Sequence, residues 1–235
     1  MKVLSLFFFI LATHVATSQG FSCPSWRLGM ETNNIRGKLV PETCGDYVKR
    51  YMLGPLYMND SKAVTDEALL YAKSQKLAGD GKDIWIFDVD ETVISHVPYF
   101  SEHGFGTEPI NGTSFFEWMT EAKAPALPYS LNLYEDLLSL GFKVVFLTGR
   151  PEYLRETTAT NLRNVGYRTW EQLILWSSSY PTNTTLELYK SNERRILETN
   201  GYRIIGNMGD QWSDINGIHP GDRTFKLPNP VYYSA

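Results

Sequence analysis

Apolar residues along most of the chain occur in short continuous runs, and between these runs they recur at helical spacing. Short apolar runs bounded by turn residues are typical of strands buried on both faces. They predict strands over 83–87, 142–147, 173–176, 202–205 and 224–227. The helical spacing predicts helices over 65–76, 129–140, 152–165 and 188–200. Strands that alternate with helices favour an α/β fold, built on one open parallel sheet with right-handed crossovers.

Two segments lie outside this alternation. Residues 19–82 form an N-terminal arm and helix, and 19–62 is expected to be irregular with short helical pieces. About forty residues separate the first strand from the next predicted helix, which is too long for a structureless loop in a compact domain. We therefore expect a main domain over 83–235 with a small cap inserted over about 95–127, helical around 114–122. The insertion carries six aromatic residues, which favour a cap above a ligand site: Tyr99, Phe100, Phe105, Phe115, Phe116 and Trp118.

The first residues are typical of a targeting segment. Lys2 precedes an apolar run over 3–12, and small residues follow at 16–18. This order predicts a secretory signal peptide over 1–18. The apolar run is shorter than the roughly 20 residues that a membrane-spanning helix needs, and no later run reaches that length. We therefore expect no membrane anchor.

Secretion changes the interpretation of Cys23 and Cys44, the two cysteines of the chain. In an oxidising compartment a single intramolecular disulfide is favoured, and it would close the arm into a loop. Two buried free thiols are the alternative. A metal site would need more ligands than lie near this pair.

Three Asn-x-Ser/Thr sequences are acceptor patterns for N-glycosylation, which a protein of the secretory pathway can receive. They begin at Asn59, Asn111 and Asn183. If they carry glycans, all three must lie on the surface.

Composition limits the partners more than it limits the activity. The chain has 22 basic and 26 acidic residues and a net charge of −4, which excludes a general electrostatic attraction to nucleic acid or an anionic membrane. Hydrophobic residues make up 43% and charged residues 20%, which excludes collagen, coiled coil and wholesale disorder. Composition does not separate an enzyme from a reserve of amino acids.

Polar residues follow the predicted strands at the points where ligands bind in open parallel sheets. The first strand is followed by Asp88-Val89-Asp90-Glu91-Thr92 and the second by Thr148-Gly149-Arg150. The last helix contributes Lys190, and the fourth strand leads into Gly209-Asp210-Gln211-Trp212-Ser213-Asp214. All of these groups would converge at one edge of the sheet.

The carboxylates of this set need a compensating charge, because several of them together resist ionising. Asp88, Asp210 and Asp214 offer oxygen ligands suited to Mg²⁺. The Lys190 ammonium and the Thr148 hydroxyl suit a phosphoryl group, as a point charge and a hydrogen-bond donor.

Two carboxylates also suit covalent chemistry on phosphorus. Asp88 could attack as a nucleophile and form an aspartyl-phosphate. Asp90, two residues on, could protonate the leaving alcohol and then activate water, and we expect it to join the Mg²⁺ ligands. Gly149 lets a backbone N–H group come close to an anion.

Each residue alone has a simpler structural explanation. A helix cap, a solvated helix charge and turn positions would account for Thr148, Lys190, Asp210 and Asp214. Arg150 either reaches substrate or pairs with a carboxylate. His96 and His103 either contact substrate or are packing and surface residues. Thr92 is expected to pin the loop around Asp88, and Glu91 has no assigned role.

Taken together, these residues resemble the motifs of the haloacid dehalogenase (HAD) superfamily of phosphohydrolases. The matching segments are 87–92, 146–150, Lys190 and 209–214. The chain resembles most closely the plant acid phosphatase and vegetative storage protein family of subfamily IIIB. That resemblance covers nearly all the chain after residue 18, with further matches at 25–28, 31–33, Cys44, 51–53 and 206–207.

The resemblance implies a Rossmann-like HAD fold with a small cap, Mg²⁺ dependence and hydrolysis of small-molecule phosphomonoesters. It implies catalytic roles for Asp88 and Asp90 and substrate binding by Thr148, Gly149 and Lys190. The implied metal ligands are Asp88, Asp90, Asp210 and Asp214. Family members reach the vacuole or the outside of the cell, and a homodimer is one assembly that the resemblance allows.

Two other functions remain open from the sequence. Some storage members of the family lack the nucleophilic aspartate, whereas this chain has Asp88, so a storage glycoprotein with low or vestigial activity is the alternative to an acid phosphatase. A module that only binds a phosphorylated ligand is a third hypothesis. The intact Asp88–Asp90 pair argues against it, because binding alone needs no carboxylate aimed at phosphorus.

Overall fold

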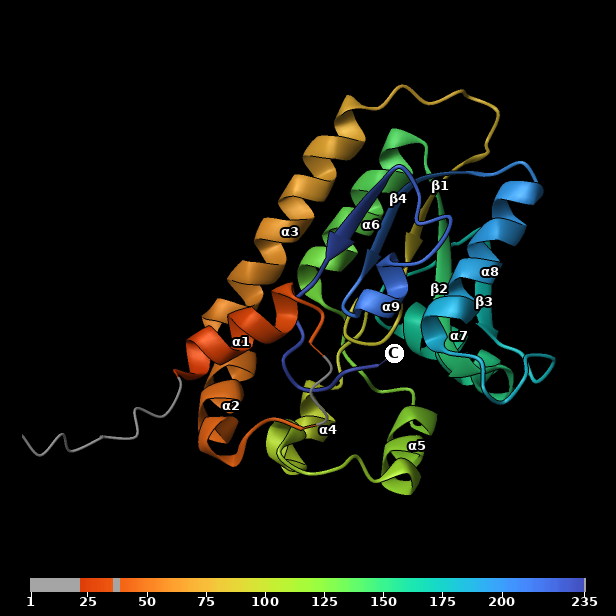
Figure 1. Ribbon diagram of the computed structural model, residues 1–235. Helices are drawn as coiled ribbons and strands as arrows, with labels where there is room; N and C mark the ends of the chain where they lie inside the picture. Colours follow the sequence, from red (N-terminus) through yellow and green to blue (C-terminus); the bar gives the residue numbers. More distant parts are fainter. Residues whose placement is uncertain (1–21, 36–38, 235) are drawn as a thin grey trace, which may run out of the picture.

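The computed structural model describes residues 22–35 and 39–234, so the signal peptide predicted over 1–18 lies outside the described residues. Its centre is a five-stranded parallel sheet with the strand order β3-β2-β1-β4-β5 (Figure 1). The strands are β1 (Asp83–Phe87), β2 (Lys143–Pro151), β3 (Gln172–Trp176), β4 (Arg203–Gly209) and β5 (Arg223–Lys226). The five predicted strands and the α/β class are thereby confirmed.

The helices fall into three groups along the chain. The N-terminal arm holds α1 (Cys23–Thr32), α2 (Gly45–Leu53) and α3 (Pro55–Ser74). The segment between β1 and α6 holds α4 (Val97–Glu102) and α5 (Gly112–Thr120). The helices that alternate with strands are α6 (Pro128–Leu140), α7 (Arg155–Asn164), α8 (Leu186–Thr199) and α9 (Trp212–Ile215). Single 3₁₀ turns lie at Glu42–Cys44, Gly104–Gly106 and Glu152–Leu154.

The sheet is covered on both faces because successive side chains of a strand point to opposite sides. Trp85 and Phe87 join a core with residues of α3, α6 and α7. Ile84 and Ile86 belong to a second core with residues of α8. In Figure 1, α3 and α6 accordingly lie on one side of the strands and α8 on the other. All five residues of β1 are buried, as a central strand requires.

Several boundaries differ from the predicted ones. The helix expected over 65–76 begins ten residues earlier, at Pro55, and the arm is therefore more helical than expected. Its buried stripe was hidden in the sequence because polar or small residues occupy it: Tyr57, Ser61, Thr65, Ala68 and Ala72. Strands β2 and β4 also extend further than predicted, to Pro151 and Gly209, so that Thr148-Gly149-Arg150 lies within β2.

A third core joins the arm to the inserted segment. Cys23 and Cys44 form the expected disulfide, which ties α1 to the start of α2. Tyr99, Phe100 and Phe105 of the insertion are buried with residues of α2 and with Val231 near the C-terminus. Half of the six aromatic rings that we expected in a cap above a ligand site therefore anchor the insertion on the arm. Figure 1 shows α4 next to α2, and both α4 and α5 beyond the carboxyl ends of the strands.

The surface features predicted from the sequence can be placed within residues 22–35 and 39–234. Asn59, Asn111 and Asn183 are all exposed, which is the condition for glycosylation, while their occupancy stays a prediction. No helix in the described part of the chain combines the length and apolar character needed to cross a bilayer.

Removal of the disulfide should weaken the whole arm. We expect the double substitution Cys23→Ser with Cys44→Ser to lower the free energy of unfolding by about 3 kcal/mol, because the bond closes a loop with a sequence separation of 21. Urea unfolding followed by circular dichroism measures this difference. Reductant should destabilise the wild type by a similar amount and leave the serine variant unaffected. Equal stability of the variant and the oxidised wild type would contradict the prediction.

Candidate active site

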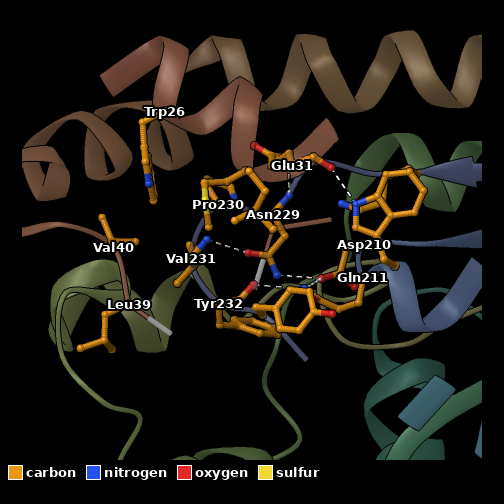
Figure 2. A pocket seen from close by; sticks show the side chains of 15 residues that line it. Trp26, Glu31, Leu39, Val40, Asp210, Gln211, Asn229, Pro230, Val231 and Tyr232 are labelled. Atoms are coloured by element: carbon orange, nitrogen blue, oxygen red, sulfur yellow. Dashed lines mark hydrogen bonds between the residues drawn. The ribbon is translucent and has the colours of Figure 1, made fainter. Parts of the chain in front are cut away.

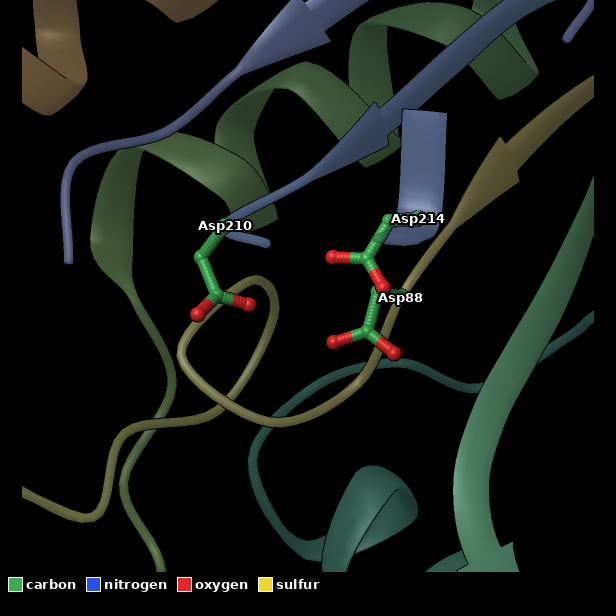
Figure 3. A group of neighbouring side chains, drawn as sticks. All are labelled: Asp88, Asp210 and Asp214. Carbon is green, nitrogen blue, oxygen red and sulfur yellow. The ribbon is translucent and has the colours of Figure 1, made fainter. Parts of the chain in front are cut away.

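Three carboxylates meet at the carboxyl edge of the sheet (Figure 3). Asp88 directly follows β1, Asp210 directly follows β4, and Asp214 lies in the single turn α9. One ligand oxygen of each lies within 4.8 Å of the others, and all three residues are buried. The backbone N–H of Asp88 donates to the Met208 carbonyl at 2.9 Å, which holds the first of these groups against β4.

Lys190 of α8 reaches between two of the carboxylates. Its Nζ donates to Asp88 Oδ1 and to Asp214 Oδ1, each at 2.5 Å, and its side chain is 4% exposed. The second oxygen of Asp88, Oδ2, accepts no hydrogen bond from any residue in 22–35 or 39–234. Lys190 therefore orients Asp88 with one oxygen held and one oxygen open.

Asp210 is held by neutral groups. Gln211 Nε2 and Asn229 Nδ2 both donate to its Oδ2 at 2.7 Å, and the Thr92 hydroxyl donates to its Oδ1 at 3.1 Å. The same Thr92 oxygen accepts from the Asp210 N–H at 3.0 Å, so Thr92 pins the loop after β1, as expected.

The Asn229 contact links the C-terminal segment to the arm (Figure 2). The Asn229 backbone N–H donates to Glu31 Oε2 of α1 at 3.0 Å, and its side-chain oxygen accepts from the Val231 N–H at 2.9 Å. These residues line a small cavity of about 50 Å³ on the arm side of Asp210. No motif in the sequence pointed to Asn229, because it lies in an irregular segment far from the motif residues.

Asp90 points to a different set of partners. Its Oδ1 accepts from Arg150 Nη2 at 2.7 Å and from Arg150 Nε at 3.0 Å, and it lies 2.5 Å from His96 Nε2. We expected Asp90 among the Mg²⁺ ligands. The structure instead places its carboxylate against a guanidinium and an imidazole, outside the group of Asp88, Asp210 and Asp214, so that ligation by Asp90 stays a prediction.

Burial and neighbouring charges shift the pKa values of Asp88, Asp90 and Asp210 in different directions. Burial raises the pKa of Asp88 well above its usual range, and Asp214 and Asp210 add to the shift against the opposing charge of Lys190. Burial and the neighbouring Asp214 raise the pKa of Asp210 to about 6. Burial also acts to raise the pKa of Asp90, but Arg150 and His96 outweigh it and hold that pKa well below its usual range.

A cavity of about 250 Å³ opens above the carboxylates. Its floor is charged and includes Asp88, Asp90 and Lys190. Its walls are apolar and include Phe115 and Met119 of α5. The arrangement combines a charged site for a compact ionic group with an apolar wall for the rest of a small molecule.

The predicted substrate-binding residues divide into two groups. Gly149 and Lys190 line the cavity, and a Cβ at Gly149 would come within 2.7 Å of Leu186 Cδ2, so a larger residue there would push the Leu186 side chain aside. Thr148 is not among the lining residues; its buried hydroxyl lies 3.4 Å from Asp90 Oδ2 and accepts from the Arg150 N–H, and substrate binding by Thr148 stays a prediction. Arg150 pairs with a carboxylate, which was one of its two expected roles.

Two other residues near the first motif can now be placed. His103 is exposed and stacks on Tyr99 with the ring centroids 3.9 Å apart, a packing role. Glu91 is fully buried in a left-handed conformation with φ 56°, and its Oε1 accepts from the His96 N–H at 2.5 Å. Glu91 therefore shapes the loop that carries His96.

The donor set of the three grouped carboxylates fits a hard divalent cation. Three buried carboxylates within 4.8 Å of one another share one lysine, and Asp210 forms no ion pair with any residue that the structure describes. Oxygen donors of this kind and an excess of negative charge suit Mg²⁺. A bound Mg²⁺ would offset that charge and polarise a phosphoryl oxygen.

Comparisons with known proteins agree on one family. The model of the HAD superfamily, subfamily IIIB (acid phosphatase), matches residues 8–235. Acid phosphatase 1 of Solanum lycopersicum is 50% identical over 212 residues, which make up 90% of this chain and 83% of that protein. The stem 28 kDa glycoprotein of Glycine max is 45% identical over 213 residues, with the same two shares. Vegetative storage protein 1 of Arabidopsis thaliana is 42% identical over 215 residues, 90% of this chain and 78% of that protein.

A solved structure supports the fold. The class C acid phosphatase from Bacillus anthracis superposes with a TM-score of 0.66, covering 80% of this chain and 85% of that one. At 21% sequence identity this likeness concerns the fold alone.

Binding of Mg²⁺ should stabilise the protein more at pH 6.5 than at pH 4.5. Because the pKa of Asp210 is raised to about 6, its contribution to stability without metal is complete near pH 4 and is lost as the pH rises through 6. A metal requires the deprotonated ligand, so it opposes this loss. At about 100 times its dissociation constant, Mg²⁺ should raise the melting temperature at pH 6.5 by about 5–10 °C.

Thermal unfolding in EDTA and in Mg²⁺ at the two pH values measures this effect. The variant Asp210→Asn should lose most of the Mg²⁺-dependent increase. An equal increase at both pH values, or an unchanged increase in the variant, would contradict the assignment of Asp210 as a ligand.

Proposed function

The chain belongs to subfamily IIIB of the HAD superfamily, the acid phosphatases, and we propose that it hydrolyses small phosphomonoesters through an aspartyl-phosphate on Asp88 with Mg²⁺ as cofactor. The observation that carries the proposal is the state of Asp88 at the floor of the cavity. One of its oxygens is held by Lys190 at 2.5 Å and the other is open toward a space of about 250 Å³. A buried carboxyl group oriented in this way suits a nucleophile in its deprotonated form, which Lys190 and a bound Mg²⁺ would both favour.

The first chemical step transfers the phosphoryl group to the protein. The open Asp88 oxygen attacks phosphorus, and the bond from phosphorus to the ester oxygen breaks with its electron pair going to the leaving alcohol. Asp90 gives a proton to that oxygen, so that a neutral alcohol departs. Lys190 and the backbone at Gly149 lie where they can receive the charge of the transferring phosphoryl oxygens.

The second step releases phosphate and restores both carboxylates. Asp90, now a carboxylate, takes a proton from a water molecule, and the water oxygen attacks the phosphorus of the aspartyl-phosphate. The bond between phosphorus and the Asp88 oxygen breaks, Asp90 passes its new proton to the phosphate, and inorganic phosphate leaves. The low pKa of Asp90 means that it rests as a carboxylate, the form that this step requires at its start.

The proton for the first step can arrive with the substrate. Phosphate monoesters lose their second proton at a pH of about 6, so below that pH they carry one. A substrate monoanion can pass this proton to Asp90, which passes it to the ester oxygen. This route favours an acidic working pH without a raised pKa at Asp90.

The chain's location and assembly are further parts of the proposal. A signal peptide over 1–18, the Cys23–Cys44 disulfide and three exposed sequons support passage through the secretory pathway to the vacuole or the outside of the cell. The names of relatives include glycoproteins of soybean stem and vegetative storage proteins. The domain limits, with a cap over about 95–127, and a homodimer stay predictions.

Loss of the nucleophile should abolish turnover. We expect Asp88→Asn to lower kcat for p-nitrophenyl phosphate by several orders of magnitude, because an amide cannot form the acyl-phosphate and nucleophile deletions in other enzymes have effects of this size. The rate of nitrophenol release with Mg²⁺ and with EDTA measures it. Asp136→Asn, the same change on the exposed face of α6, is the matched control and should keep the wild-type rate. A wild-type rate in Asp88→Asn would refute the mechanism.

Storage is the second candidate function, favoured by the two vegetative storage proteins of Arabidopsis thaliana among the similar proteins. It is compatible with catalysis, because a storage protein can retain a complete site. Such a protein should accumulate in vegetative tissue and increase with nitrogen supply. Quantitative immunoblots across tissues and nitrogen levels measure this, and low abundance in every tissue would exclude the storage role.

A further inference from the structure

His96 lies between the candidate proton-transfer residue and the inserted helix α5. Its Nε2 is 2.5 Å from Asp90 Oδ1, and its Nδ1 accepts from Trp118 Nε1 at 2.8 Å. The imidazole is fully buried, and its ring packs edge to face on Phe115 with the centroids 4.9 Å apart. The sequence around His96 did not indicate its contact with Asp90 or its contact with Trp118.

The Trp118 contact fixes the tautomer of His96. An indole N–H only donates, so the Nδ1 that receives it carries no hydrogen. In the neutral ring the hydrogen must then be on Nε2, where it points at Asp90. Arg150 Nη2 lies 3.5 Å from Nε2, too far to replace that bond. The neutral His96 ring therefore donates a hydrogen bond from Nε2 to Asp90 and accepts none from it.

This donor makes the two oxygens of Asp90 unequal. Oδ1 receives His96 and two N–H groups of Arg150, all between 2.5 and 3.0 Å. Among the described residues, Oδ2 receives only Arg150 Nε at 3.1 Å and the Thr148 hydroxyl at 3.4 Å. Oδ2 is therefore the oxygen with capacity left to hold and release a proton.

The helix that fixes His96 also forms a wall of the cavity. Phe115 and Met119 of α5 line the space above Asp88, and Trp118 lies between them in the sequence. The same helix can therefore contact the alcohol part of a substrate and orient the residue that protonates it.

We propose that His96, locked by Trp118, is a positioning residue that turns Oδ2 of Asp90 toward the ester oxygen and so supports protonation of the leaving alcohol. This inference rests on the proposed phosphatase function. Its consequence depends on the leaving group. A nitrophenolate leaves without help, whereas an aliphatic alkoxide is strongly basic and needs the proton.

The test compares two substrates in the full-length enzyme with Mg²⁺. In His96→Ala and Trp118→Phe we expect the single-turnover rate of alcohol release from butyl phosphate to fall by about 10- to 100-fold, the lower part of the usual contribution of general acid–base catalysis. We expect the burst rate of nitrophenol release from p-nitrophenyl phosphate to change less than about threefold, since this first step needs no proton on its leaving group and the nucleophile and its lysine are untouched. Single-turnover rates are compared because Asp90 also activates the water of the second step, which both substrates share. His96→Gln, whose amide N–H can replace Nε2–H, should recover part of the loss on butyl phosphate.

His103→Ala is the control, because this exposed histidine belongs to the same insertion and packs on Tyr99, with its Nδ1 2.7 Å from the Tyr99 carbonyl. It should change neither rate. Active-site titration by the nitrophenol burst gives the competent fraction of each variant. If His96→Ala does not fold, Trp118→Phe decides the matter, because it keeps an aromatic ring and removes only the donor to Nδ1.

The outcomes separate the two proposals. An equal loss on both substrates, or no loss on either, would overturn the role of His96 while leaving the phosphatase proposal intact. A wild-type protein that hydrolyses neither substrate would instead overturn the proposed function. Selective loss on butyl phosphate, with recovery in His96→Gln, is the result that the geometry predicts.

Discussion

The crowding of negative charge at one edge of the sheet is the constraint on which the rest of this structure depends. Asp88 and Asp214 share Lys190, and Asp90 is matched by Arg150. Asp210 receives only hydrogen bonds from neutral groups of the described chain. Charges in a buried site interact strongly and are costly to leave unpaired. This imbalance is the physical reason to expect a divalent cation at the edge.

The ion pairs of Asp88 and Asp90 also place the oxygens of the two carboxylates differently. The partner of Asp88 leaves one oxygen open to the cavity, as a nucleophile requires. The partners of Asp90 crowd one oxygen and spare the other, as a proton carrier requires. Two aspartates separated by one residue thus have different surroundings, set by Lys190 on α8 and Arg150 on β2, and these surroundings fit the two different roles that we propose for them.

The N-terminal arm and the C-terminal segment contact the same edge of the sheet on the side of Asp210. The disulfide fixes α1, Glu31 of α1 receives the Asn229 backbone, and the Asn229 side chain holds Asp210. Aromatic rings of the insertion pack on α2, and this packing anchors α4 beside the site. The arm, which lacks motif residues, therefore takes part in shaping a site built from motifs far along the chain.

The sequence by itself determined the five strands, the order of helices between them and the convergence of Asp88, Lys190, Asp210 and Asp214, because strand and helix periodicity are local and parallel strands end at one edge. It also indicated the Cys23–Cys44 bond, since only one pairing exists. Only the tertiary structure decided that α3 begins at Pro55, that the Thr148 hydroxyl lies beside Asp90 Oδ2, and that His96 and Asn229 reach the site. Those contacts join side chains across folded elements, and no periodicity along the chain encodes such a distance.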